Sequence, residues 1–236
     1  MSNSYFQFKQ FRIQQDNCAM KVCTDSCMFG AWIPVADNVQ NILDIGAGTG
    51  LLSLMLAQKS NAFIDAIEID LSAFEQASEN IHQSIWRDKI HIIHRDIKEF
   101  EPKKKYDLIV CNPPFYEKDV LSEQLNERVA KHSSHLTLNE LLQTVKLHIS
   151  NAGQFAILLP YKRKIEFEKI AANIGLFPHK ILLLKQTPKH DYFRYIALCS
   201  TSIAENIITE TICIKDGNNQ YSQEATHLLK PYYLHL

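Results

Sequence analysis

The tetrapeptide Asn112-Pro113-Pro114-Phe115 has the residue types needed to hold a planar amino group. It follows the apolar run at residues 106–111, so we expect it at the end of a buried strand, where two prolines prevent continuation. The Asn112 amide oxygen and the Pro113 carbonyl can each accept one hydrogen of an exocyclic NH2 group, with Phe115 as a stacking surface. Such a site suits chemistry at nitrogen. An ordinary proline-rich turn is the alternative.

A second segment, residues 44–50 (DIGAGTG), has the composition of a strand end, a glycine-rich turn and a helix start. Gly46, Gly48 and Gly50 allow a sharp turn and a close approach to a ligand, and a helix N-terminus offers free N–H groups. The spacing alone also suits a dinucleotide. Asp44 favours a different ligand, because its carboxylate repels a pyrophosphate and attracts the amino group of an aminoacyl cofactor.

Acidic side chains end the next two predicted strands. Glu68 and Asp70 come about twenty residues after the glycine loop, a position from which a carboxylate accepts hydrogen bonds from ribose hydroxyls. Asp96 ends the following strand, where it can accept a hydrogen bond from an adenine amino group while Ile97 covers the ring. Each acid alone can be a helix cap. Together with the loop, they outline S-adenosylmethionine.

These segments require a sheet that brings strand ends together. From residue 41 onward, apolar runs alternate with segments of helical period, which predicts an α/β fold with a mostly parallel, seven-stranded sheet and helices on both faces. Ligands bind beyond the carboxyl ends of such strands. The predicted strands are 42–45, 63–69, 90–94, 106–111, 153–159, 180–184 and 192–200. The predicted helices are 51–58, 72–84, 138–149 and 164–175, the last capped by Gly175.

Composition narrows the class of protein. The 236 residues, 46% hydrophobic and 22% charged, suit one α/β domain with an elaboration. No apolar run approaches the ~18 residues of a membrane span, and we expect no signal peptide. Cys18, Cys23 and Cys27 lack the spacing of a metal site. We expect no metal and free thiols in a reducing cytoplasm.

Charge is divided unevenly along the chain, although its net value is only −1. Residues 37–100 hold ten acidic and five basic side chains, whereas residues 151–200 hold eight basic and three acidic ones. The second segment can form a basic face for phosphates. The alternative is that these basic side chains are distributed by chance over the solvated surface.

Several motifs in order resemble a known family. Residues 43–50 (LDIGAGTG), 66–70 (AIEID), the Asp96 strand and NPPF resemble Rossmann-like class I S-adenosylmethionine-dependent methyltransferases that act on amino groups. Residues 15–32 (QDNCAMKVCTDSCMFGAW) resemble the N-terminal signature of the bacterial tRNA1(Val) (adenine(37)-N6)-methyltransferases, and residues 228–234 (LLKPYYL) are similar to their tail. Cys23 departs from the glycine often found in that signature.

The resemblance implies a fold and an activity. Residues 1–36 would form an N-terminal extension packing over the cofactor site of a single methyltransferase domain, residues 37–236. Lys21, Thr24 and Asp25 would reach the methionine end of the cofactor. The enzyme, a cytoplasmic monomer without metal, would methylate N6 of adenine 37 in the tRNA anticodon loop. From the residues alone, Thr24 can instead cap a helix at 25–32, and Lys21 can be plain surface.

If the resemblance holds, Asn112 and Pro113 hold N6 with its lone pair toward the methyl group, and Phe115 or Tyr116 stacks on the splayed base beside Pro114. The residues expected to contact RNA phosphates are basic: Lys162, Arg163, Lys164, Lys185, Lys189 and Arg194. We expect the lysines at 103–105 to be a solvated loop. We expect the N-terminal aromatics (Tyr5, Phe6, Phe8, Phe11) and the apolar residues of the C-terminal tail, among them Ile207 and Ile208, to pack on the core.

Three other functions stay open from the sequence. NPPF suits methylation of a protein glutamine amide equally well, although that function does not explain the basic excess at 151–200. Guanine N2 methylation in rRNA is a second possibility. The third is a non-catalytic module that binds S-adenosylmethionine, in which the glycine loop or NPPF should have decayed first.

Overall fold

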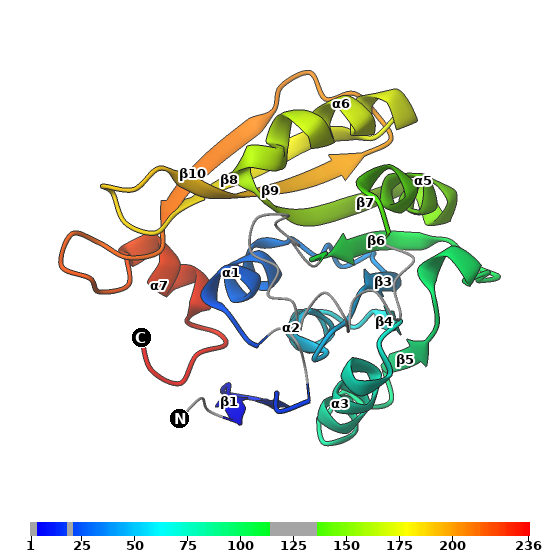
Figure 1. Ribbon diagram of the computed structural model, residues 1–236, viewed down its shortest axis with the longest axis horizontal. Helices are drawn as coiled ribbons and strands as arrows, with labels where there is room; N and C mark the ends of the chain where they lie inside the picture. The colour runs from blue at the N-terminus through cyan, green and yellow to red at the C-terminus, as the bar shows by residue number, and fades with distance from the viewer. Residues whose placement is uncertain (1–3, 18–20, 114–135) are drawn as a thin grey trace, which may run out of the picture.

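An eight-stranded sheet forms the centre of the computed structural model, which describes residues 4–17, 21–113 and 136–236 (Figure 1). The strand order is β10-β8-β9-β7-β6-β3-β4-β5, and every neighbouring pair is parallel except those that β9 makes with β7 and β8. The strands are β3 (Asn41–Ile45), β4 (Phe63–Glu68), β5 (Ile90–His94), β6 (Tyr106–Cys111), β7 (Ile149–Pro160), β8 (Phe177–Lys185), β9 (Tyr192–Ser200) and β10 (Ile208–Cys213).

The predicted class is confirmed, but the predicted count of seven strands is wrong. All seven predicted strands are present, and β10 is the eighth. It pairs in parallel with β8, from Ile208 opposite Lys180 to Cys213 opposite Lys185. Its sequence carries only a weak strand signal, because a strand at the sheet edge buries little. Ile207 and Ile208, which we expected in the core, are more than half exposed.

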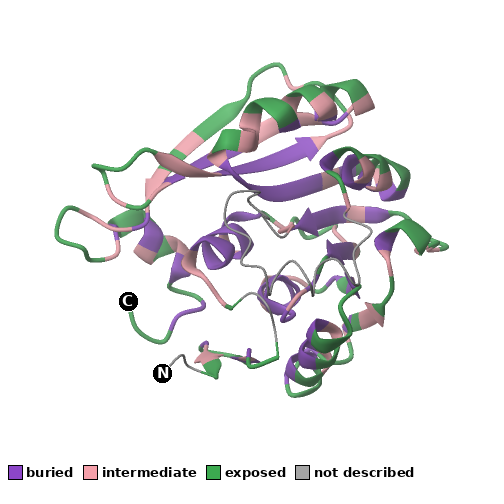
Figure 2. Ribbon diagram, viewed as in Figure 1, coloured by how far each residue is buried: buried purple, intermediate pink, exposed green. Residues whose placement is uncertain are grey.

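Helices cover both faces of the sheet, as predicted. Successive strand residues point to opposite faces, so Leu108 and Val110 join one core while Ile109 and Cys111 join the other. Figure 2 shows the resulting buried strands at the centre of the molecule. One core is covered by α1 (Thr24–Trp32), α2 (Leu51–Lys59), α3 (Leu71–His82) and α7 (Gln223–Leu229), the other by α5 (Leu138–His148) and α6 (Lys164–Ile174).

The start of α5 and the end of α6 follow the local chemistry of their residues. The Thr137 and Glu140 side chains form a capping box at the start of α5, and α6 ends at Gly175 in the left-handed conformation (φ 79°), as predicted. Thr24, however, is the first residue of α1 and not its cap. Cys23 occupies the cap position and makes no side-chain capping hydrogen bond.

The end of α1 is held by a buried lysine of α2. The Lys59 ammonium donates hydrogen bonds to the carbonyls of Gly30 (2.6 Å), Ala31 (3.1 Å) and Ile33. These are carbonyls that the end of a helix leaves without partners, so Lys59 fixes α1 against α2. Burial lowers the pKa of Lys59 to about 7.

Both chain termini pack on the same core. The hairpin of β1 (Tyr5–Gln7) and β2 (Arg12–Gln14) brings Phe8 against Phe11 (ring centroids 4.4 Å apart) and Tyr233 (5.8 Å). Phe8 and Phe11 are buried, as expected, whereas Tyr5 is 45% exposed. Within the described residues, no helix has the length and apolar character that crossing a membrane requires.

Candidate functional site

The glycine loop between β3 and α2 turns through three left-handed residues. Gly46 (φ 76°), Gly48 (φ 57°) and Gly50 (φ 80°) adopt a conformation that side chains disfavour. Main-chain amides of Gly46 and Ala47 donate to the Ile67 carbonyl of β4, which holds the loop at the strand ends. A Cβ added to Gly46 or Gly48 would meet no atom within 4 Å. The backbone therefore borders open space that a ligand can approach.

Asp44 is a fully buried carboxylate at the end of β3, and only one of its two oxygens accepts a hydrogen bond among the described residues. Its Oδ2 accepts a hydrogen bond from the Ser53 hydroxyl of α2 (2.7 Å), but its Oδ1 has no partner in residues 4–17, 21–113 and 136–236. Burial raises its pKa to about 6, and the charge of Glu68 adds to the shift against the hydrogen bond from Ser53. A cation at Oδ1 would relieve this deficit.

Glu68, at the end of β4, braces the glycine loop. Its Oε2 accepts the Gly48 amide (2.8 Å), and its Oε1 accepts the amides of Ile69 and Asp70 (both 2.9 Å). Because a carboxylate oxygen can accept two hydrogen bonds, Glu68 keeps acceptor capacity at Oε2 beside the loop. This geometry suits the hydroxyl groups of a ribose.

Asp70 and Asp96 cap short elements, the alternative that the sequence left open. Asp70 caps α3 by accepting the Ala73 amide (2.8 Å). Asp96 caps the 3-10 turn η1 (Ile97–Glu99) by accepting the Lys98 amide (2.9 Å), and it lies 3.8 Å from the Lys98 ammonium. Capping explains why an acid stands at each position. It is compatible with ligand contact, for which these two residues remain predictions together with Ile97.

Asn112 stands beside the glycine loop, because β6 pairs with β3 in a register that puts Cys111 opposite Ile45. Its Nδ2 donates to the Ser26 hydroxyl of α1 (2.9 Å), whereas its buried Oδ1 has no partner among the described residues. Pro113 follows, half-buried. The other predicted residues of this loop, Pro114, Phe115 and Tyr116, lie outside the described residues.

The three residues predicted from the N-terminal segment, Lys21, Thr24 and Asp25, differ in burial. Asp25 is buried, and its Oδ2 accepts the Arg194 Nε of β9 (2.6 Å) while its Oδ1 accepts the Ser26 amide (3.1 Å). Thr24 is half-buried, and Lys21 is exposed. Asp25 therefore joins α1 to the sheet next to Asn112. A role of these residues in holding the cofactor remains a prediction.

The predicted basic residues gather beyond the carboxyl end of β7. Lys162 and Arg163 belong to the turn η2 (Tyr161–Arg163), Lys164 begins α6, and Lys189 is exposed between β8 and β9. Arg163 forms two hydrogen bonds with Glu166 (2.9 and 3.0 Å). Arg194, as described, pairs with Asp25. Contact of these residues with phosphates remains a prediction.

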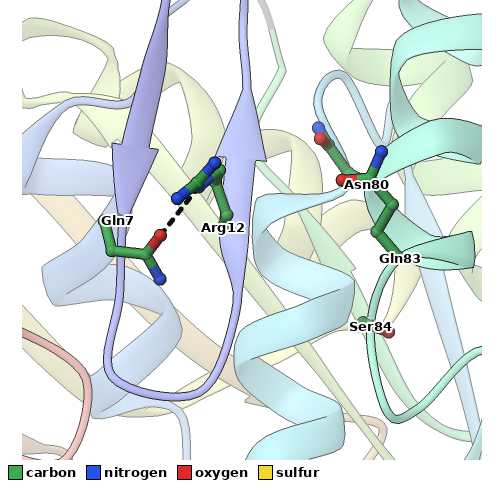
Figure 3. Close-up of a pocket in the computed structure, with 5 residues that line it drawn as sticks. All are labelled: Gln7, Arg12, Asn80, Gln83 and Ser84. Carbon is green, nitrogen blue, oxygen red and sulfur yellow. Dashed lines mark hydrogen bonds between the residues drawn. The ribbon is translucent and has the colours of Figure 1, made fainter.

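A pocket elsewhere is not this site. It opens between the β1–β2 hairpin and α3, and its lining consists of Gln7, Arg12, Asn80, Gln83 and Ser84 (Figure 3). Arg12 donates to Gln7 (2.7 Å) across the hairpin, and Asn80 donates to the carbonyls of Gln14 and Thr49 (both 2.9 Å). The hydrogen bonds of Asn80 thus join the N-terminal segment to the glycine loop.

Comparison with known proteins decides the family. Residues 24–157 match the model of the methyltransferase small domain. A tRNA1(Val) (adenine(37)-N6)-methyltransferase of Cytophaga hutchinsonii is 39% identical over 239 residues, covering all of both chains. Another, of Dyadobacter fermentans, is 42% identical over 237 residues and 98% of each chain. The chain belongs to the tRNA1(Val) (adenine(37)-N6)-methyltransferase family. The resemblance predicted from residues 15–32 is confirmed.

Solved structures support the fold of this family member. A predicted O-methyltransferase from Agrobacterium tumefaciens superposes with a TM-score of 0.68, covering 87% of this chain and 95% of that one. Sequence identity is only 15%, so the likeness concerns the class I methyltransferase fold alone. Because the chain belongs to this methyltransferase family, the protein is an enzyme with S-adenosylmethionine as cosubstrate.

The residues present fit this cosubstrate. Of three buried side-chain oxygens without a partner among the described residues, two (Asp44 Oδ1 and Asn112 Oδ1) end the neighbouring strands β3 and β6. Open space adjoins the glycine loop between β3 and α2. Two supporting residues, Ser53 and Ser26, were not predicted. A serine within the apolar run of α2 was the available signal for Ser53, whereas nothing in the sequence indicated that Ser26 faces Asn112.

Proposed function

We propose that this chain transfers a methyl group from S-adenosylmethionine to N6 of adenine 37 in tRNA1(Val). The names of full-length relatives at about 40% identity support the substrate. One observation at the site supports the chemistry: Asn112 Oδ1 is buried, lacks a partner within the part of the chain that the structure describes, and is oriented by the contact of its amide with Ser26. An acceptor in that state suits an amino hydrogen of adenine.

The cosubstrate is held by the residues at the strand ends. Asp44 Oδ1 receives its amino group, and the glycine loop and Glu68 receive its ribose. Asp96 and Ile97 face its adenine, and Lys21 and Thr24 lie toward its methionine end. When bound, S-adenosylmethionine supplies an electrophilic methyl group on sulfur. A charged Asp44 favours binding because it faces a cation.

The target adenine is held by Asn112 and the Pro113 carbonyl. Each accepts one hydrogen of N6, which turns the nitrogen lone pair toward the methyl group. The same two acceptors stabilise the positive charge that would develop on N6 as the N–C bond forms and the S–C bond breaks. S-adenosylhomocysteine would leave, and the surplus proton on N6 would pass to water. Orientation of this kind can lower a barrier by about 7–11 kcal/mol, so the reaction needs no strong base.

The aromatic side chain of Phe115 or Tyr116 stacks on the splayed base, and Pro114 borders it. Lys162, Lys164 and Lys189 contact phosphates of the anticodon loop. On this proposal the enzyme acts as a monomer in the cytoplasm, where its tRNA substrate is found. A protein glutamine amide or an rRNA guanine is the less favoured substrate.

The test is transfer of labelled methyl from S-adenosylmethionine to total tRNA from a strain that lacks this enzyme, followed by nucleoside analysis. We expect N6-methyladenosine in one valine isoacceptor, beside the anticodon. Label in protein or rRNA and none in tRNA would overturn the substrate. The Asn112→Ala variant should lose turnover and keep its affinity for S-adenosylmethionine. If the wild type binds the cosubstrate but methylates no pool, the protein is a binding module.

A further inference from the structure

Two tyrosines and a lysine form a cluster beyond the carboxyl end of β7. Tyr161 begins η2 directly after β7, and Tyr192 begins β9. Their ring centroids lie 5.2 Å apart at an interplanar angle of 42°, and the Lys185 ammonium, from the end of β8, lies 4.8 Å from the Tyr192 centroid. All three side chains are half-buried. We call them the tyrosine–lysine cluster.

The cluster lies beyond the same end of the sheet as the proposed catalytic site. Cys111, the residue before Asn112, lies opposite Ile157 of β7, and Pro160 lies opposite Arg194 of β9. Tyr161 is therefore three residues further along the strand direction than Asn112. In an extended strand that is about 10 Å, at the same edge of the sheet. Arg194, two residues after Tyr192, also pairs with Asp25, whose neighbour Ser26 holds Asn112.

The chemistry of the cluster matches single-stranded nucleic acid. Aromatic rings with a cation beside them offer a stacking surface for a base and a charge for its phosphate. Lys185 and Lys189 form no ion pair in the part of the chain that the structure describes, in contrast to Lys180, which pairs with Glu210 at 3.1 Å. The surrounding segment, residues 151–200, carries the basic excess of the chain. An acidic peptide would use the charge but not the rings.

We propose that the tyrosine–lysine cluster binds the RNA next to the target adenine, with Tyr161 and Tyr192 stacking on an unpaired base and Lys185 contacting its phosphate. This inference rests on the proposed function, and it names the surface that selects an unpaired loop over a duplex. RNA loops present such splayed bases, whereas a duplex keeps them stacked.

The test measures binding of a fluorescent anticodon stem-loop RNA to the full chain at several salt concentrations. Tyr192→Leu and Tyr161→Leu keep apolar bulk and remove the ring, so each should weaken binding at least about fivefold with an unchanged salt slope. Tyr192→Phe keeps the ring and should bind within twofold of wild type. Lys185→Gln should lower the slope of log K against log salt by about 0.7, the value for one phosphate on a single strand.

Lys103→Gln is the matched control, because it removes one charge from an exposed loop before β6, at the opposite end of the strands. It should change neither affinity nor slope. Affinity for S-adenosylmethionine, measured by calorimetry, should stay within twofold in every variant, which excludes general unfolding. The leucine variants should raise KM for tRNA more than they lower kcat.

Two results would overturn the inference. One is RNA binding within twofold of wild type in both leucine variants, together with an unchanged slope for Lys185→Gln. The other is weaker binding of a glutamine-containing peptide to these variants, together with unchanged binding of RNA. Because the assay measures RNA binding and not methyl transfer, failure of the inference can be told apart from failure of the proposed function. If the wild type methylates tRNA and the variants still bind RNA normally, only the inference fails.

Discussion

The Asn112 side chain donates its Nδ2 hydrogen to Ser26 Oγ across 2.9 Å, linking β6 to a helix 86 residues earlier in the chain. Because the amide nitrogen only donates hydrogen bonds, this contact fixes the rotation of the amide and leaves its acceptor, Oδ1, available to a substrate. The Cys23 sulfur lies 2.9 Å from the same Ser26 oxygen, so a short polar chain from the N-terminal segment sets the orientation of Asn112.

Ser26→Ala should therefore lower kcat about tenfold or more. A buried amide left without its partner costs about 1–3 kcal/mol, and the freed Asn112 can rotate away from its productive orientation. Steady-state kinetics with tRNA and calorimetry with S-adenosylmethionine measure the effect, and cosubstrate affinity should change little.

Ser84→Ala is the matched control for this variant. Ser84 is also a buried serine, but its hydroxyl donates to the Ile81 carbonyl (2.8 Å) far from Asn112 along the fold. It should cost stability without lowering kcat. Equal kcat values for Ser26→Ala and wild type would show that Asn112 needs no support from α1.

Affinity for S-adenosylmethionine should depend on pH through Asp44. Its pKa, raised to about 6 by burial, means that the carboxylate is charged above pH 7 and neutral below pH 5. Since the proposed partner is an ammonium group, affinity should be full above pH 7. It should fall up to about tenfold per pH unit below 6. Calorimetry between pH 5 and 8 checks this, and Asp44→Asn should bind weakly without that pH dependence.

The buried Asp44 carboxylate should also lower the free energy of unfolding of the cosubstrate-free enzyme at neutral pH. An acid with a raised folded-state pKa binds more protons when folded, so stability falls as pH rises from about 4 to above 6. A shift of about two units corresponds to about 3 kcal/mol.

Chemical denaturation of wild type and Asp44→Asn at pH 4 and pH 8 isolates this contribution. The stability of the variant relative to wild type should be about 2 kcal/mol greater at pH 8 than at pH 4, because any cost of the buried amide itself is independent of pH. A difference that does not change with pH would contradict the assignment. Asp37→Asn, at an exposed position, should show no such change.

The ion pair between Asp25 and Arg194 should stabilise the packing of α1 on the sheet. Their side chains are 10% and 27% exposed, and the Nε–Oδ2 distance is 2.6 Å. Arg194→Leu leaves a buried carboxylate without its partner, which should cost about 2–3 kcal/mol, somewhat below the value for a fully buried pair.

Urea denaturation measures the cost, and the double variant Asp25→Asn/Arg194→Leu should recover much of it, since no unpaired charge remains. A cost below about 0.5 kcal/mol for the single variant would mean that the pair behaves as an exposed one.

Local patterns were enough for most of the fold. The seven apolar runs, the glycine at 175 and the capping residues each act on near neighbours, so their consequences can be read along the chain. β10 escaped prediction because an edge strand needs few buried side chains. Thr24 looked like a helix cap, but α1 begins at Thr24 itself, one residue earlier than expected, and Cys23 takes the cap position.

The sequence by itself determined the class of the enzyme: the glycine loop, the acids at strand ends and NPPF are short segments whose chemistry depends on their own residues. Only the tertiary structure decided how these groups are supported. Ser26 reaches Asn112, Ser53 reaches Asp44, and Tyr161 meets Tyr192, because the sheet register and helix packing bring them together. Contacts between residues far apart in the chain arise from the burial of whole strands and helices, and no local pattern carries that information.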